Sequence, residues 1–171
     1  MLVMGTHMNR QVRFSEQNQT ITVESGMTGP DYEHLLNQAP ETLGATCRYT
    51  GGHFPQSFEY SSVGGWVATL GSGQASSLYG DAGDLVMGLT VVTPAGTFET
   101  HDYPSCATGP KLVDILKGSE GCFGIIVAIT FKIFEYTPET VRPFSFMFPD
   151  FEQAVAACRQ ISQGRFGMPS I

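Results

Sequence analysis

Basic residues are scarce in this chain of 171 residues: Lys and Arg number nine against 16 Asp and Glu, which gives a formal net charge of −7. The basic residues form no cluster, whereas a nucleic-acid surface needs clustered basic side chains to neutralise phosphates. We therefore expect no nucleic-acid partner. For the same reason, an anionic ligand would have to be held mainly by backbone amides.

Long apolar runs are also missing. None approaches the length of about 18 residues that suggests a membrane span, and residues 1–5 lack the basic and apolar segments of a secretory signal. The composition, 42% apolar and 15% charged, is typical of a globular protein. We expect a soluble, cytoplasmic chain, although a full-length protein that contains it could associate peripherally with a membrane.

Patterns that would indicate a metal centre or a catalytic group are absent as well. No Cys-x-x-Cys pair occurs, so neither a zinc site nor a disulfide framework is predicted. His53 and His101 have no carboxylate at a recognisable catalytic spacing, and we expect them to be loop or surface histidines. No catalytic residue and no metal ligand is assigned. The cysteines are expected to be thiols in a reducing compartment: Cys47, Cys106, Cys122 and Cys158.

Glycine, by contrast, is concentrated in residues 61–73, which read Ser-Ser-Val-Gly-Gly-Trp-Val-Ala-Thr-Leu-Gly-Ser-Gly. This mixture is expected neither to fill a core nor to extend a helix. Without side chains at Gly64 and Gly65, main-chain N–H groups can approach the oxygens of a ligand, and Ser61, Ser62 and Thr69 can add hydrogen bonds. The stretch predicts an anion-binding loop, although a glycine pair alone would more simply be a turn.

A second glycine-rich loop occupies residues 118–124, where glycine stands at every third position. It runs directly into residues 125–134, a long strand that is nearly all apolar at first and is therefore expected to cross the middle of a sheet. The loop is the second place where bare backbone would be presented to a ligand.

The remaining pattern predicts a mixture of hairpins and short helices. Residues 41–58 show no period, and residues 50–55 among them are expected to form a loop, while residues 74–84 are small and polar. A proline opens each of two short helices, the first ending near Pro40 and the second just before Gly118. The predicted strands are 11–14 with 20–24 and 85–93 with 97–100, and the helices start at Pro30 and Pro110.

The character of the chain changes near Arg142, where we place a domain boundary. Residues 144–148 are predicted to be a strand, and Asp150 can cap a helix over residues 151–163. One strand and one helix cannot bury their own apolar faces, and the end of the chain shows no capped element. We therefore expect the chain to be a piece of a longer protein.

Several motifs in a fixed order carry a family resemblance. The chain resembles the FAD-binding domain, of the PCMH type, of the vanillyl-alcohol-oxidase family of FAD-linked oxidases, over most of residues 1–142. The Trp after the glycine pair and the Ala-Thr-Gly-Pro are most similar to the alkyldihydroxyacetone-phosphate synthase branch. The motifs are His53-Phe54-Pro55-Gln56-Ser57, Ser61-Ser62-Val63-Gly64-Gly65-Trp66, Ser72-Gly73, Tyr79-Gly80, Asp84-Leu85-Val86, Val92-Thr93-Pro94-Ala95-Gly96, Ala107-Thr108-Gly109-Pro110 and Gly118-Ser119-Glu120-Gly121.

The resemblance implies an α+β fold, mainly an antiparallel sheet flanked by helices, that corresponds to the second subdomain of the PCMH-type fold. Residues 1–142 would be the FAD-binding domain without its upstream phosphate loop. Residues 143–171 would be the first strand and helix of a truncated cap domain. The rest of the cap, outside this chain, would bind a small-molecule substrate, and a homo-oligomer is compatible with this organisation.

The implied cofactor is non-covalent FAD. Gln56 stands where the family usually has Asp, Leu70 where it often has Arg, and Cys122 where it usually has Thr, so two charged groups are missing. Without the upstream loop, we expect the chain alone to bind FAD weakly or not at all and to be inactive. The implied contacts are Pro55, Gln56, Ser57, Ser61, Ser62, Gly64, Gly65, Ala68, Thr69, Leu70, Gly71, Glu120, Gly121, Cys122, Gly124, Ile125 and Ile126.

The resemblance implies a flavin-dependent enzyme that exchanges the acyl chain of an acyl-dihydroxyacetone phosphate for a fatty alcohol. Two alternatives stay open at this point. The same domain could serve an FAD-dependent 2-hydroxyacid dehydrogenase acting on lactate or glycolate. It could also be a flavin-free structural or interaction domain on the same scaffold, because a fold alone does not establish a function.

Overall fold

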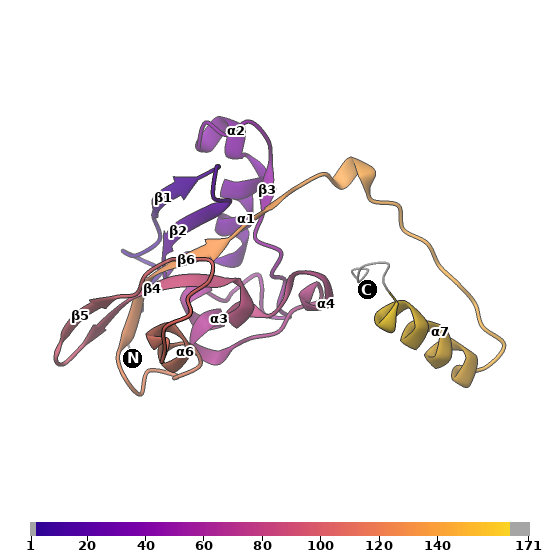
Figure 1. The fold of residues 1–171 in the computed structure, drawn as a ribbon. Coiled ribbons are helices and arrows are strands. Elements are labelled where there is room, and N and C mark those ends of the chain that lie inside the picture. The colour runs from indigo at the N-terminus through magenta and orange to yellow at the C-terminus, as the bar shows by residue number, and fades with distance from the viewer. Residues whose placement is uncertain (1–2, 165–171) are drawn as a thin grey trace.

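A central antiparallel sheet organises the computed structural model, which describes residues 3–164 (Figure 1). Its five strands follow the order β1-β2-β6-β4-β5, and every neighbouring pair is antiparallel. The long apolar strand β6 has a neighbour on both sides, so the predicted central position is confirmed. The strands are β1 (Gln11–Ser15), β2 (Thr20–Glu24), β4 (Val86–Thr93), β5 (Gly96–Glu99) and β6 (Ile125–Lys132).

The register of the sheet separates an apolar face from a polar face. Ile129 of β6 lies opposite Val23 of β2 and Leu89 of β4, and all three side chains are buried. The neighbouring pair of β2 and β6, Thr22 and Thr130, points to the other face, where the two hydroxyls lie 2.9 Å apart. Because successive side chains of a strand alternate between faces, only the first face can carry the core.

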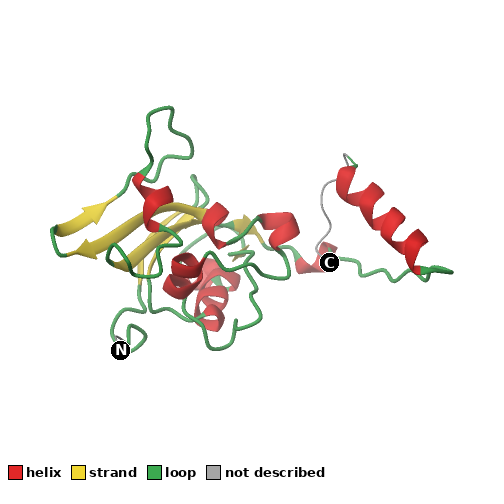
Figure 2. Ribbon diagram, turned by 90° about the horizontal axis from the view of Figure 1, so that it is seen from below, coloured by secondary structure: helices red, strands yellow, loops and turns green. Residues whose placement is uncertain are grey.

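Helices supply the other half of the core. Tyr32 and Leu36 of α1 pack with Val63 and Trp66 of α3 against the apolar strand residues. Figure 2 shows these helices gathered about the sheet, with the C-terminal helix standing apart. The helices of this layer are α1 (Gly29–Asn37), α2 (Ala39–Thr42), α3 (Val63–Thr69), α4 (Ser76–Tyr79), α5 (Ala82–Leu85) and α6 (Leu112–Leu116).

The expectation that the glycine-rich stretch cannot form a helix is wrong, because α3 occupies its middle. The Ser62 side chain caps this helix by accepting a hydrogen bond from the Gly65 amide. Val63, Trp66 and Val67 recur at i, i+3 and i+4 and are all buried. Each glycine in a helix costs about 1 kcal/mol relative to alanine. The free energy gained by burying this apolar stripe outweighs that cost.

Four further elements were not predicted or begin elsewhere than predicted. Residues 74–85 contain the short helices α4 and α5, for which no element was predicted. Helix α6 begins at Leu112, two residues after Pro110, with Lys111 as its N-cap. Residues 41–58 contain β3 (Tyr49–Thr50), which pairs with β7 (Phe134–Glu135) in a small antiparallel sheet. Two residues are too few to produce a strand period, so β3 left no signal in the sequence.

The segment that follows β7 leaves the body of the protein. A 3₁₀ turn (Pro138–Thr140) precedes residues 141–150, which lie extended (Figure 1). The strand predicted over residues 144–148 is wrong: no strand among the described residues pairs with it, and Phe144 and Phe146 are 76% and 77% exposed. The helix α7 (Phe151–Gln163) is confirmed, with Asp150 accepting a hydrogen bond from the Gln153 amide at 2.8 Å.

Two observations complete the fold. Within residues 3–164, no helix combines the length and the apolar character that crossing a membrane requires. The residues that follow Gly164 had been expected to end without a capped element, and they lie outside the described part of the chain. The boundary proposed near Arg142 stays a prediction.

Candidate functional site

Helix α3 joins the two glycine-rich stretches. At its first turn, the Val63 amide donates to the Met27 carbonyl at 2.9 Å, which ties the helix to the end of β2. At its last turn, the carbonyls of Val67 and Ala68 accept hydrogen bonds from the amides of Gly118 and Glu120 at 2.9 and 3.1 Å. Residues 61–73 and residues 118–124 are therefore in direct backbone contact.

The two glycines of the pair have different surroundings. A Cβ atom on Gly64 would lie 2.5 Å from Ser25 Cβ, so this glycine lets α3 pack closely on β2. A Cβ atom on Gly65 would meet only Ser62 Oγ, at 3.5 Å, and Gly65 is exposed. The expectation that both amides are free for a ligand is wrong: the Gly64 amide donates to the Ser25 carbonyl and the Gly65 amide to Ser62 Oγ.

Bare backbone nevertheless faces outward along one side of α3. The Thr69 hydroxyl donates to the Gly65 carbonyl at 2.9 Å, which aligns both residues on the exposed side of the helix. In the neighbouring loop, Gly121 has a φ of 86°, and a Cβ atom there would meet nothing within 4 Å. We call this surface the α3 strip and define it by Ser62, Gly65, Ala68, Thr69 and Gly121.

A cavity of about 630 Å³ lies at the loop that precedes α3. Predicted contacts Pro55 and Gln56 form one wall, and residues 72–74, absent from the predicted set, form the other. A Cβ atom on Gly73 would lie 2.7 Å from the Phe54 carbonyl, and the Gln74 amide donates to that carbonyl at 3.0 Å. The isolated Ser72-Gly73 motif was the only sequence signal for this wall, since close backbone approach requires glycine.

His53 lies in a loop, as one of the two predicted alternatives had it, but it is buried: the residue is 2% exposed, and its ring lies 4.9 Å from the ring of Trp66. Neither ring nitrogen has a hydrogen-bond partner among the described residues. Burial lowers the pKa of His53, against a smaller opposing effect of Asp81, so the ring is favoured as neutral imidazole. A neutral imidazole offers one donor and one acceptor, and both are unpaired here.

The loop that carries His53 is fixed by a buried carboxylate on α1. Glu33 accepts hydrogen bonds from the Gly51 amide at 2.7 Å and from the Thr50 hydroxyl at 2.9 Å. Burial raises the pKa of Glu33, while these hydrogen bonds act in the opposite direction. No sequence pattern singles out Glu33, because its role depends on the loop folding back over α1.

Several other predicted contacts take part in packing. Leu70 adopts a left-handed conformation at the end of α3, and its side chain lies where Gly83 and Gly118 lack theirs. Ser61 Oγ accepts a hydrogen bond from the Trp66 indole N–H at 2.7 Å. A Cβ atom on Gly124 would lie 2.6 Å from the carbonyl oxygen of Val92. These side chains and this glycine hold the elements together, whatever ligand the surface binds.

The remaining predicted residues border this region. Gly71 faces His53: a Cβ atom there would lie 3.8 Å from the imidazole Nε2. Glu120 adopts a φ of 49° in the loop beside α3. The side chains of Ser57, Cys122 and Ile125 are exposed and that of Ile126 is half-buried. Contact of these residues with FAD stays a prediction.

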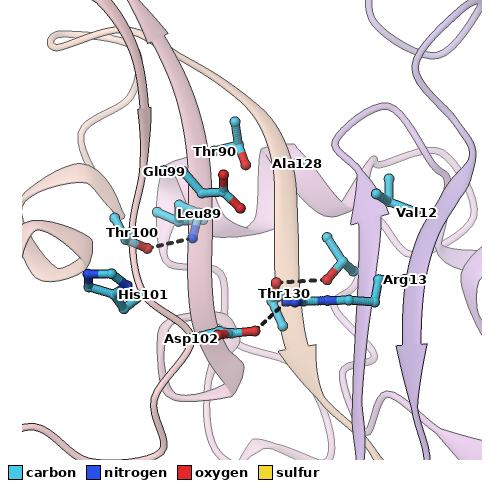
Figure 3. A pocket seen from close by; sticks show the side chains of 11 residues that line it. Val12, Arg13, Leu89, Thr90, Glu99, Thr100, His101, Asp102, Ala128 and Thr130 are labelled. Atoms are coloured by element: carbon cyan, nitrogen blue, oxygen red, sulfur yellow. Dashed lines mark hydrogen bonds and ion pairs between the residues drawn. The ribbon is translucent and has the colours of Figure 1, made fainter.

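A separate hollow lies on the polar face of the sheet, away from the helices (Figure 3). It measures about 510 Å³. Arg13 of β1 reaches across the Thr22–Thr130 pair and forms an ion pair with Asp102, as the dashed lines show. None of the predicted FAD contacts lines this hollow.

Comparison with known proteins identifies the domain. Residues 1–101, more than half of the chain, match the model of the FAD binding domain family. The chain belongs to this family. It is 36% identical to an alkyldihydroxyacetonephosphate synthase of Dictyostelium discoideum, over 90% of this chain and 24% of the synthase. It is 33% identical to the FAD-linked oxidoreductase YgcU of Escherichia coli, over 92% of this chain and 31% of that protein.

A solved structure agrees with these relatives. An alkyldihydroxyacetonephosphate synthase superimposes with a TM-score of 0.74 at 33% identity, covering 90% of this chain and 26% of the synthase. The chain thus spans about a quarter of the length of the synthases that it matches. FAD is the cofactor of this domain, the family is one of flavin-dependent enzymes, and the predicted α+β class is confirmed.

The described residues fit this cofactor in two respects. The α3 strip leaves open space where side chains would otherwise stand, as a flat ring or a phosphate needs for close approach to backbone. The unpaired nitrogens of His53 lie behind Gly71, one of the predicted contacts, and a buried polar group without a partner calls for an explanation. A polar ligand group at Gly71 would provide one.

Proposed function

We propose that the α3 strip and the cavity between residues 54–58 and 72–74 are the FAD contacts of an enzyme that forms alkyldihydroxyacetone phosphate. One observation carries this proposal: α3 carries an exposed glycine at position 65, and the last turn of the same helix is joined by backbone hydrogen bonds to the loop that holds the open Gly121. An exposed glycine inside a helix lowers stability, and Gly65 has no packing role that would explain it. Gly64, next to it, is needed for packing.

The residues of this chain bind and orient the cofactor. When bound, FAD supplies the electron-accepting and nucleophilic chemistry of its ring system. Pro55 and Gln56 line one side of the contact surface and Gly65 and Gly121 the other. His53 offers a hydrogen bond from behind Gly71. The synthase activity itself is inferred from the similarity to the synthases, of which this chain spans about a quarter.

Trp66 is the only tryptophan of the chain and provides a direct binding assay. We expect FAD to quench its emission in a saturable manner, with a dissociation constant above about 10 μM, in line with the weak binding expected of these residues alone. Protein that is yellow with bound FAD as purified would contradict the expected weakness.

Gly121→Ala and Gly44→Ala form a matched pair for this titration. Both glycines have positive φ angles, 86° and 68°, and neither would place a Cβ atom within 4 Å of another group. The strain of the two substitutions is therefore similar, but Gly44 lies away from the α3 strip. We expect only Gly121→Ala to weaken quenching. Equal quenching by both variants and the native chain would overturn the assignment of the strip.

The catalysed reaction needs a separate test on a longer protein that contains this domain. Formation of the alkyl product from acyl-dihydroxyacetone phosphate and a fatty alcohol would support the proposed synthase. Anaerobic bleaching of its bound flavin by lactate or glycolate, without alkyl product, would instead assign a 2-hydroxyacid dehydrogenase. Failure of such a protein to retain any flavin would favour a structural domain.

A further inference from the structure

All three lysines of the chain, Lys111, Lys117 and Lys132, line one cavity of about 680 Å³, which we call the lysine cavity. They come from different places: the two ends of α6 and the end of β6. The segment after β5 forms another wall, where the rings of His101 and Tyr103 stack at a centroid distance of 5.0 Å. A chain of net charge −7 thus gathers its lysine ammonium groups at one place.

Two of these ammonium groups have no acidic partner among the described residues. Lys117 forms an ion pair with Asp114 at 2.8 Å. Lys132 Nζ donates to the backbone carbonyl of Asp84 at 3.0 Å, which uses one of its three donors and leaves its charge uncompensated. Lys111 takes part in none of the ion pairs that residues 3–164 form.

The field of Lys111 reaches groups on the cavity wall. A hydrogen bond with Lys117 lowers the pKa of Asp114, and the charge of Lys111 adds to this effect. Hydrogen bonds with Thr108 lower the pKa of the Cys106 thiol, and the charge of Lys111 again acts in the same direction. In both cases the effect of Lys111 is the smaller one, and its direction indicates positive potential at this wall.

Three carboxylates, those of Asp84, Glu99 and Asp114, also line the cavity. Asp114 pairs with Lys117, and the Asp84 carboxylate accepts a hydrogen bond from the Asp81 amide at the start of α5. Figure 3 shows the Glu99 side chain extending over the polar sheet face between β4 and β6, whereas His101 extends in the opposite direction. Within residues 3–164, Lys111 and Lys132 are thus the ammonium groups of the cavity that no carboxylate meets at ion-pair distance.

We propose that the lysine cavity binds a small phosphate-bearing anion, either free phosphate or the monoester of a small organic molecule. Lysine ammonium groups bind phosphate as point charges, and the two uncompensated ones stand on separate elements, so that an anion between them could contact both. The volume is within the range of small-ligand pockets, about 300–1,000 Å³. It leaves room for an organic group beside the stacked His101 and Tyr103 rings. The site requires no flavin.

Cys106 is exposed, lines the same cavity and can report its occupancy. We would alkylate the chain with uncharged iodoacetamide and follow each cysteine by peptide mass spectrometry, with the exposed Cys158 of α7 as internal reference. A site with a dissociation constant of about 1 mM is mostly filled at about 10 mM phosphate, which should slow labelling of Cys106 by about fivefold or more. Labelling of Cys158 should not change.

Single charge removals provide the controls. Lys111→Gln and Lys132→Gln should each abolish the protection of Cys106 by phosphate. For each variant, the labelling rates with and without phosphate are compared, because removal of Lys111 also changes the reactivity of the thiol itself. Arg159→Gln, which removes a positive charge from the exposed face of α7, should keep it. Equal protection by chloride at matched ionic strength, or equal protection in Lys111→Gln and Arg159→Gln, would overturn the proposal. Stronger protection by glycerol 3-phosphate than by phosphate would assign a monoester, and equal protection free phosphate.

Discussion

Alanine substitutions at the adjacent glycines 64 and 65 should have opposite effects on stability. In helix α3, a Cβ atom on Gly65 would make only an ordinary contact with Ser62 Oγ at 3.5 Å, and Gly65→Ala should gain about 0.5 kcal/mol from helix propensity. For a domain of this size that corresponds to a rise of about 1–2 °C in the unfolding midpoint. A Cβ atom on Gly64 would lie 2.5 Å from Ser25 Cβ and 2.7 Å from its carbonyl oxygen, so Gly64→Ala should cost about 1–3 kcal/mol.

The effect of Gly65→Ala on FAD affinity should be opposite to its effect on stability. If Gly65 is retained because FAD lies against α3, the more stable Gly65→Ala variant should bind FAD more weakly. A loss of about 0.7–1.4 kcal/mol, from one methyl group in the contact surface, corresponds to about three- to tenfold in the dissociation constant. Stability would thus be traded for affinity at a single position.

Urea unfolding followed by Trp66 emission gives the stability of each variant, and an FAD titration with the same signal gives the affinity. Gly64→Ala is compared at a urea-free concentration where it is still folded, as far-ultraviolet circular dichroism would show. Gly65→Ala that is more stable and binds FAD as tightly as the native chain would refute the placement of FAD on the α3 strip.

Three further predictions concern residues that are not part of this helix. Burial raises the pKa of Glu33 above its ordinary 4.5. The stability that protonated Glu33 contributes should be complete below pH 4.5 and should be lost as pH rises through the raised pKa. In urea unfolding at a series of pH values, Glu33→Gln should not show this loss. Burial lowers the pKa of His53 below 6.5, so stability should fall as pH drops from 6.5 through the lowered value, and His53→Phe should remove this dependence while weakening FAD quenching. Chymotrypsin should cut first after the exposed Phe144 or Phe146 and leave a product with an unchanged urea midpoint. Early cuts within residues 11–136 would contradict the boundary near Arg142.

Elements with their own periodicity could be predicted from the sequence. The alternating residues 20–24, the apolar run that became β6 and the capped helix α7 all fold as their patterns indicate. Each of these patterns extends over at least five residues and is typical of one kind of element. The family resemblance then supplied the fold class that local patterns could not.

The failures share a physical cause, which is dependence on distant partners. Helix α3 was not predicted because glycine disfavours helices, although Val63, Trp66 and Val67 have the helical spacing. The strand predicted over residues 144–148 has no neighbouring strand among the described residues, although a strand requires one to satisfy its backbone. The burial of His53 could not be predicted either. It depends on Glu33 of α1, which holds the loop through the Gly51 amide, and on Trp66 of α3, which packs against the ring.

The pairing of β3 with β7 has a mechanical consequence. Strand β3 ends at Thr50, three residues before His53, and β7 ends at Glu135, where the chain leaves the body. Arg48 strengthens this clasp through an ion pair with Glu139 at 2.7 Å. A pull or rotation applied to the segment beyond residue 138 is therefore transmitted through a two-residue ladder to the loop that carries His53. Movement of the segment that leaves the body at β7 is therefore coupled, through the β3–β7 pair, to the position of the His53 loop behind the proposed flavin surface.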